Sequence, residues 1–277
     1  MEPRSSSACF GGRMAFYEHA SAATGTTMRF GVYLPPQSER GPCPALYYLA
    51  GLTCTEETFP IKAGAQQYAA EHGLVLVAPD TSPRGLGLPG ETEAWDFGEG
   101  AGFYLDATAA PWADHYQMAR YVTQELPALI EREFPVSRRR GVFGHSMGGH
   151  GALVTALRDP ARWHSVSAFA PISNPVAVPW GQKAFPRYLG PDERAWAEWD
   201  ASLLMRRQAY PGPILVDQGL ADQFLETQLR PEALEQAAAA SGQHLMLRRH
   251  EGYDHSYWFI QSFMGEHIAH HARQLVG

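Results

Sequence analysis

Short apolar runs alternate with longer segments of helical character along most of the chain. The runs lie at 26–34, 45–49, 74–78, 141–143, 166–170, 214–216 and 245–247. Continuous apolar runs of this length are typical of strands that are buried on both faces of a parallel sheet. A proline pair ends the first segment, which we interpret as one arm of an antiparallel edge. The pattern predicts an α/β fold with a mostly parallel central sheet and helices on both faces.

Periodicity and proline positions locate three of the helices. Apolar residues recur at helical spacing over 118–130, and Pro127 should kink or restart that helix. Pro231 is expected to open a second helix, which continues with strong helix formers until Gly242. A terminal helix is expected over 258–275.

The 277 residues suit one large α/β domain, because no linker, repeat or low-complexity stretch interrupts the alternation. We predict a single domain over residues 15–277. Residues 1–14 have no secretory apolar region, and we expect them to form a disordered extension. The segment 169–199 is rich in proline and aromatic residues, and we expect an ordered excursion over one face. Loops of this kind, at the carboxyl ends of strands, build the binding site in α/β sheets.

The charge distribution limits which partners the protein can bind, and the cysteine pattern indicates the compartment in which it resides. The chain has 22 basic and 29 acidic residues, and its longest basic run, at 138–140, is assigned to a helix-to-strand loop. Nucleic acid is therefore not expected as a partner, because backbone binding needs a clustered basic face. No apolar run is long enough to span a bilayer, so a membrane is not expected either. Cys9, Cys43 and Cys54 form no CxxC pair, which favours free thiols and the cytoplasm.

A G-x-S-x-G motif at 144–148 is the strongest chemical signal in the chain. It lies between the apolar run at 141–143 and a helix-like run at 149–158. Small residues at both flanks permit a sharp strand-to-helix turn, which holds the serine hydroxyl above the sheet. The motif predicts Ser146 as a nucleophile and an α/β-hydrolase fold.

A serine nucleophile needs a base, and the base needs an orienting carboxylate. In this fold the chain order is serine, acid, histidine. Asp217 still belongs to the apolar run that begins at 214, so we interpret it as a structural hydrogen-bonding residue. Asp222 lies in the loop beyond the strand end and is our candidate for the acid.

His255 is our candidate for the base, because it lies between the last strand and the terminal helix. His250 lies at the strand end and is expected to pack. Asp254 is adjacent to His255, but neighbouring side chains in a turn usually diverge. His145 and His150 flank the serine, and we expect hydrogen-bonded packing around the turn.

The oxyanion that forms during acyl transfer needs two backbone N–H donors. One should be Met147, the residue after the serine, and the other should come from the loop after the strand at 45–49. Gly51 lets this backbone approach closely, and Leu52 is our choice of donor.

With these positions assembled, the chain resembles the S-formylglutathione hydrolase (esterase D) family of the α/β-hydrolase superfamily. The similarity covers nearly the whole chain from about Tyr17 onward. The strings that carry it include LAGLTCT at 49–55, VAPDTSPRG at 77–85, WDFGEGAGFY at 95–104, GHSMGGHGA at 144–152, PWGQKAF at 179–185, DQGLADQF at 217–224 and GYDHSY at 252–257. Several of these are far more specific than G-x-S-x-G.

The resemblance implies a triad of Ser146, Asp222 and His255 and an oxyanion hole formed by Leu52 and Met147. It also implies hydrolysis of S-formylglutathione, a glutathione thioester, to glutathione and formate in formaldehyde detoxification. This reaction needs no cofactor and no metal. The family leads us to expect a homodimer.

Three further residues are candidates for the substrate pocket. Trp180 would wall a small acyl pocket, with packing alone as the alternative. Cys54 lies two residues beyond the proposed oxyanion donor, so its modification should block substrate, unless it is simply a small buried residue. Lys62 and Lys183 are the only lysines in a chain that otherwise uses arginine, which points to contact with a carboxylate. Of the two, Lys183 is placed near the site.

Two other functions remain open. The first is a general carboxylesterase or acetylesterase that uses the same triad on oxygen esters. The second is a hydrolase-fold protein that only binds a ligand or partner. His267, His270 and His271 have metal-like spacing, but we attribute them to the favourable helix dipole rather than to a metal site.

Overall fold

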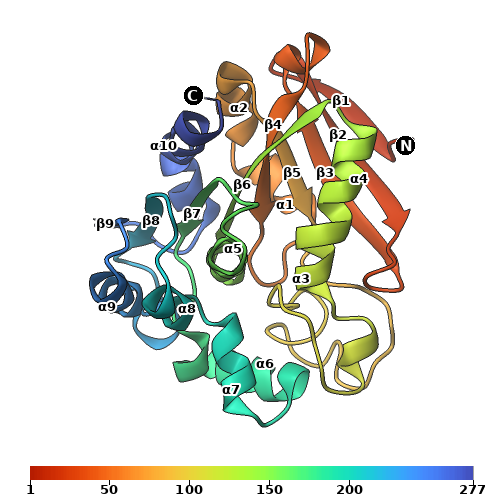
Figure 1. Ribbon diagram of the computed structural model, residues 1–277. Helices are drawn as coiled ribbons and strands as arrows, with labels where there is room; N and C mark the ends of the chain where they lie inside the picture. The colour runs from red at the N-terminus through yellow and green to blue at the C-terminus, as the bar shows by residue number, and fades with distance from the viewer. Residues whose placement is uncertain (277) are drawn as a thin grey trace.

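A single mixed sheet runs through the computed structural model, which describes residues 1–276. Within that range the sheet has nine strands in the order β1-β2-β3-β5-β4-β6-β7-β8-β9 (Figure 1). The strands are β1 (Ser5–Cys9), β2 (Gly12–Ala20), β3 (Thr27–Leu34), β4 (Cys43–Leu49), β5 (Val75–Pro79), β6 (Val136–His145), β7 (Ser165–Phe169), β8 (Ile214–Gly219) and β9 (Leu245–His250). β1, β2 and β3 are antiparallel to their neighbours, and β4 to β9 are parallel.

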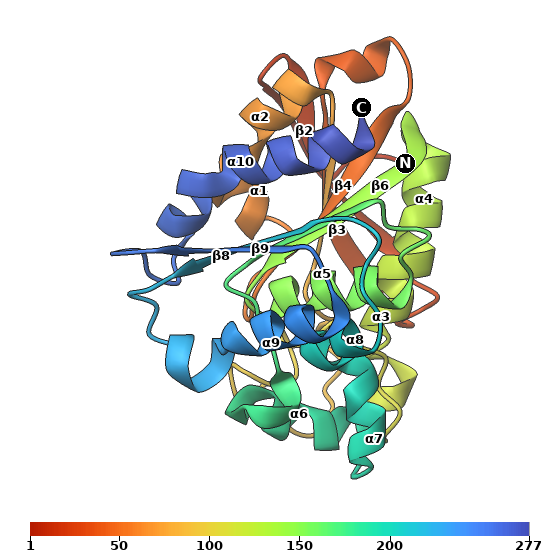
Figure 2. The same ribbon diagram turned by 60° about the vertical axis from the view of Figure 1, so that its left-hand side comes forward.

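Helices cover both faces of this sheet. They are α1 (Thr58–Lys62), α2 (Ala65–His72), α3 (Met118–Arg120), α4 (Leu126–Glu133), α5 (Met147–Arg158), α6 (Pro179–Leu189), α7 (Glu193–Trp196), α8 (Ala201–Arg207), α9 (Glu232–Ser241) and α10 (Tyr257–Leu275). Figure 2 shows α1, α2 and α10 on one side of the sheet and α5, α8 and α9 on the other. This arrangement confirms the predicted α/β class. No helix within residues 1–276 is long and apolar enough to cross a membrane.

The apolar runs located seven strands, but the first two were missed. Residues 1–14 were predicted to be disordered, and that prediction is wrong. β1 pairs with β2 through the turn at Phe10 and Gly11, both of which have positive φ. The side chains of β1 are mostly exposed on both faces, so the strand is joined by backbone hydrogen bonds and leaves no apolar pattern. Consequently β3 is antiparallel, as predicted, but it is not an edge strand.

The arginine run at 138–140 was assigned to a loop, and it lies instead within β6. β6 extends beyond the apolar run because its first half pairs with β4. Arg140 forms an ion pair with Glu131 at 2.8 Å, and its guanidinium lies 5.8 Å from the centre of the Trp163 ring. These partners stabilise a charged residue in a strand.

The helical predictions hold, with one refinement. A π-helix at Tyr121–Glu125 separates α3 from α4, and Pro127 lies in the first turn of α4, where its missing N–H costs no hydrogen bond. The segment 169–199 is ordered, as expected, and carries α6 and α7. In Figure 1 these two helices lie together at the lower end of the molecule.

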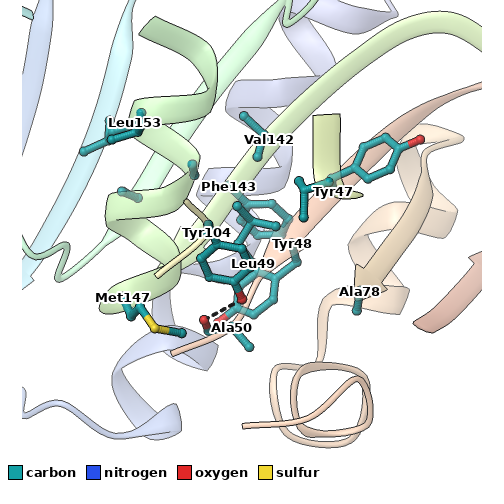
Figure 3. Close-up of a cluster of buried hydrophobic side chains, with 14 of the residues drawn as sticks. Tyr47, Tyr48, Leu49, Ala50, Ala78, Tyr104, Val142, Phe143, Met147 and Leu153 are labelled. Carbon is teal, nitrogen blue, oxygen red and sulfur yellow. Dashed lines mark hydrogen bonds between the residues drawn. The ribbon is translucent and has the colours of Figure 1, made fainter. Parts of the chain in front are cut away.

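The buried core reaches the carboxyl end of β4. Figure 3 shows Tyr48 and Leu49 packed among buried side chains, with Phe143 of β6 and Met147 of α5 nearby. The Tyr104 hydroxyl donates a hydrogen bond to the carbonyl of Ala50 at 2.9 Å. This bond anchors the loop that follows β4 to the core.

Candidate active site

Ser146 lies on a sharp turn between β6 and α5. Its backbone has φ 58° and ψ −119°, a conformation that a residue other than glycine rarely adopts. A Cβ on Gly148 would lie 1.9 Å from the carbonyl oxygen of Leu49, and one on Gly144 would lie 2.3 Å from the carbonyl oxygen of Gly148. A side chain at either glycine would therefore clash with a backbone carbonyl oxygen. The turn has the geometry of a nucleophile elbow.

Asp222 and His255 meet above this turn. The carboxylate Oδ2 of Asp222 lies 2.5 Å from Nδ1 of His255. The backbone N–H of Phe224 donates to Oδ1 of Asp222 at 2.8 Å, which fixes the carboxylate. Asp222 is buried beyond the end of β8. One ring nitrogen of His255 is thus committed to the carboxylate, which leaves Nε2 for a second partner.

Ser146 and His255 line the same cavity, whose volume is about 280 Å³. No hydrogen bond joins the Ser146 hydroxyl to His255 among the described residues. In enzymes without substrate, catalytic hydrogen bonds are often long and tighten only when the substrate binds. The arrangement therefore brings a hydroxyl, an imidazole and a carboxylate together in the order that nucleophilic catalysis requires.

Asp217 forms a separate and fully bonded cluster, as the structural interpretation predicted. Arg248 donates to both of its carboxylate oxygens, at 2.6 and 2.5 Å, and His267 Nε2 lies 3.1 Å from Oδ2. Burial alone would raise the pKa of Asp217, but hydrogen bonds from His267 and Arg248 lower it below its ordinary value. His250 packs, as expected, by stacking on Phe263 with ring centres 3.8 Å apart.

The histidines beside the serine are buried, but the hydrogen bonds expected of them are largely missing. His145 Nε2 and both ring nitrogens of His150 have no hydrogen-bond partner within residues 1–276. His145 lies against His255, with ring centres 4.3 Å apart. Burial, together with the neighbouring His255, lowers the pKa of His145 well below its ordinary value. His145 is therefore a neutral ring that packs against the candidate base.

Leu52 and Met147 bring two backbone N–H groups to the serine. Gly51 lies so close that a Cβ there would be 3.3 Å from the Ser146 Cβ. Thr53, with φ 68°, donates its N–H to Gly100 at 2.9 Å and so turns the loop after β4. Within residues 1–276, neither the Leu52 nor the Met147 N–H donates to another group. Both donors remain available for an oxyanion.

Three aromatic side chains that line the cavity pack against one another. Trp180 packs edge-on against Trp95, with ring centres 5.8 Å apart, and its ring is tilted against that of Phe224, with ring centres 4.8 Å apart. The Phe224 ring in turn lies 5.0 Å from the ring of His255. Trp180 thus lines the cavity, as the sequence suggested, whereas Trp95 and Phe224 were not identified. Both lie in strings that resemble the family, and that was the available signal.

Lys183 does not line the cavity, which corrects its assignment to the pocket. It lies on α6 one turn after Trp180, but its ammonium forms an ion pair with Asp96, the neighbour of Trp95. The charge is therefore used within the protein. Its position instead ties α6 to the loop that carries Trp95, behind the aromatic wall.

Cys54 also lines the cavity, as do Thr58, Lys62 and Tyr257. Its thiol is free, and burial raises its pKa above the ordinary value. The protonated thiol is therefore favoured at neutral pH, so Cys54 is a poor candidate for a nucleophile. Its place in the wall agrees with the expectation that it lies close to the reacting centre.

The three histidines of α10 face the sheet. His271 contacts the hydroxyls of Ser165 and Ser167 at 2.6 and 2.8 Å, and His270 Nε2 lies 3.0 Å from the Val166 carbonyl. Burial lowers the pKa of all three, and that of His270 falls to about 4. They are neutral packing residues, so the helix-dipole explanation is wrong, because it needs positive charge.

The chain is similar to known proteins over nearly its whole length. Residues 21–270 match the family model described as "Putative esterase". The chain is 55% identical to S-formylglutathione hydrolase of Mus musculus over 98% of this chain and 97% of that one, and 54% identical to that of Paracoccus denitrificans over 96% and 95%. A solved S-formylglutathione hydrolase from Agrobacterium tumefaciens superposes with a TM-score of 0.96 at 48% identity, covering 99% of this chain and 100% of that one.

Proposed function

This chain belongs to the S-formylglutathione hydrolase family, and we propose that it cleaves the thioester S-formylglutathione to glutathione and formate through a formyl-serine intermediate. The observation that carries this proposal is the cavity in which an elbow serine faces a histidine paired with a buried aspartate. Family membership adds the identity of the substrate.

In the acylation step, His255 takes the proton of the Ser146 hydroxyl while the oxygen attacks the formyl carbon. The carbonyl oxygen becomes an oxyanion, which accepts hydrogen bonds from the N–H groups of Leu52 and Met147. The carbon–sulfur bond then breaks, and the departing glutathione sulfur takes the proton from His255, which returns the imidazole to its neutral form. Asp222 holds the imidazole in the tautomer that accepts the proton and stabilises the imidazolium that forms.

In the deacylation step, His255 takes a proton from water, and the hydroxide attacks the formyl-serine ester. The second oxyanion occupies the same pair of donors, formate departs, and Ser146 regains its proton. Each oxyanion donor is worth roughly 3 to 4 kcal/mol in comparable enzymes. Support for these roles is the contact of Gly51 with Ser146 and the two unused N–H groups beside it.

The wall formed by Trp95, Trp180 and Phe224 explains why a small acyl group suits this cavity. A formyl group has no carbon substituent, so it fits against a wall that would crowd larger acyl groups. A thiolate is also a good leaving group, so acylation needs less acid assistance than cleavage of an amide.

The selectivity between substrates tests this proposal. We expect kcat/KM for S-formylglutathione to exceed that for a simple aryl acetate by at least about a hundredfold, which corresponds to roughly 3 kcal/mol. A ratio near one would instead support the general carboxylesterase. Failure of a fluorophosphonate probe to label Ser146 would support a protein that only binds a ligand.

We also propose a reducing compartment, the cytoplasm, and a homodimer. Free Cys9, Cys43 and Cys54 support the first, and family membership supports the second. Neither nucleic acid nor a membrane is a proposed partner. Sedimentation of the purified protein tests the dimer, and a monomer at micromolar concentration would contradict it.

A further inference from the structure

A second cavity of about 630 Å³ adjoins the catalytic one. The two share Lys62 and Tyr257 as lining residues. The second cavity is an open groove between α1 and the start of α10, on the same side of the sheet (Figure 2). Its size suits the body of a small ligand rather than an acyl group alone.

The rim of this groove exposes apolar side chains. Ile61 is 70% exposed and Trp258 is 77% exposed, and both line the groove. Trp258 lies three residues after His255, the candidate base. Large apolar groups that remain exposed beside a reacting centre mark a surface that a ligand covers.

Lys62 is the only permanently charged residue among the described residues that line the two cavities. Its ammonium lies 5.9 Å from the centre of the Tyr257 ring and has no carboxylate partner within residues 1–276. Lys183 differs, because Asp96 neutralises it. A ligand that enters the groove therefore meets one uncompensated positive charge and no negative charge.

The two cavities differ in their aromatic lining, and this difference suggests how the substrate lies. Trp95, Trp180 and Phe224 line the catalytic cavity but not the groove, whereas Lys62 and Tyr257 line both, so we place the formyl group against the three aromatic side chains. The sulfur and the rest of the leaving group must then extend along Cys54 and Tyr257 into the groove.

We propose that this groove binds the glutathionyl peptide of the substrate, with the Lys62 ammonium against one of its two carboxylates. The inference rests on the proposed function and assigns the determinant of its leaving-group specificity. Lysine suits this role because a point charge on a flexible stem can follow a mobile carboxylate. Trp258 and Ile61 cover the apolar parts of the peptide.

Two measurements test the assignment on the full chain. The first compares kcat/KM for S-formylglutathione and for an aryl acetate without a carboxylate, in wild type and in Lys62→Met. We expect the ratio of the two values to fall by about 2- to 5-fold, as for loss of a partly exposed ion pair. Lys62→Arg should restore most of the ratio, and Lys62→Glu should lower it further.

The second measurement is inhibition of aryl acetate hydrolysis by reduced glutathione, which does not depend on thioester turnover. We expect the inhibition constant to rise by the same factor in Lys62→Met. Arg194→Met is the matched control, because it removes one positive charge, as Lys62→Met does. The Arg194 side chain, however, is 94% exposed and lies outside both cavities. It should change neither quantity.

An unchanged ratio and an unchanged inhibition constant in Lys62→Met would overturn the assignment while leaving the proposed function intact. If the proposed function is wrong, the result differs, because wild type itself would then show no preference for S-formylglutathione over the aryl acetate. In that case, inhibition by glutathione still decides whether the groove binds the peptide.

Discussion

Two aspartates near the carboxyl end of β8, five residues apart, each contact a histidine, yet only one of these histidines lines the cavity of Ser146. Asp217 is bonded by Arg248 and His267, and the other ring nitrogen of His267 bonds to the Ser167 hydroxyl. Asp222 holds one nitrogen of His255 and leaves the other facing the cavity of Ser146. The first pair is saturated, and the second is not.

This difference separates the pair that we propose to be catalytic from the structural one. Both carboxylates are buried and both lie close to an imidazole, so neither proximity nor burial separates them. A base needs one nitrogen that is oriented and one that is free. Spare hydrogen-bonding capacity beside a nucleophile is therefore the property to look for.

The largest expected effect is on catalytic activity, which should depend on Asp222 and not on Asp217. Asp222→Asn should lower kcat/KM for S-formylglutathione by about 10⁴, because the amide favours the wrong histidine tautomer. Stability should change little, since the amide oxygen can still accept the Phe224 N–H. Steady-state kinetics and thermal melting check both. A loss of less than tenfold would show that Asp222 does not orient the base.

The second largest expected effect is on the free energy of unfolding, which should depend on Asp217 more than on Asp222. Asp217→Asn should lower the free energy of unfolding by about 3 kcal/mol, because the charge-assisted hydrogen bonds from Arg248, which keeps Glu266 as its other partner, and from His267 are weakened. Urea denaturation measures the change. Asp254→Asn is the control, since that exposed carboxylate accepts hydrogen bonds from Ser256 and, within residues 1–276, from no other residue. If Asp217→Asn lost activity like Asp222→Asn and kept its stability, the comparison would fail.

The structural histidines should also make the fold sensitive to acid. Burial lowers the pKa of His270 from 6.5 to about 4, so the unfolded chain takes up a proton first as the pH falls. The free energy of unfolding should therefore decrease between about pH 6.5 and pH 4, by up to about 3 kcal/mol at roughly 1.4 kcal/mol per pKa unit. In His270→Gln the slope should be smaller, and an equal slope would exclude His270 as its source.

The smallest effect concerns Cys54. Cys54→Ser should change kcat/KM by less than about threefold, because the thiol serves as wall and not as nucleophile. Alkylation of wild type should instead abolish activity by filling the cavity. The reaction should accelerate as the pH rises toward the raised pKa of this thiol. Persistent inactivation of Cys54→Ser by the alkylating agent would place the sensitive thiol elsewhere.

Much of the fold could be predicted from the sequence, because buried parallel strands appear in it as continuous apolar runs. β1 left none, since its side chains are exposed and its pairing depends on backbone groups that every residue shares. The position of Asp222 beyond the strand end separated it from Asp217, and in the structure Asp222 is the one bonded to His255, while its catalytic role stays a prediction.

What the sequence could not supply is the partner of each polar side chain. Lys183 looked like a substrate contact, but Asp96 lies 87 residues away in the chain and only the fold brings them together. The hydroxyls of Ser165 and Ser167 on β7 explain the histidines of α10 in the same way. Such pairings are long-range, and no local pattern encodes them.

The release of formate from S-formylglutathione by wild type and by Ser146→Ala tests the central claim most directly. We predict rapid turnover by wild type and a loss of at least 10⁴-fold in kcat for Ser146→Ala, of the order seen when a serine nucleophile is removed. The variant should remain folded and should still bind glutathione. Ser146→Ala with kcat within tenfold of wild type would contradict the account, because the nucleophile would then be another group.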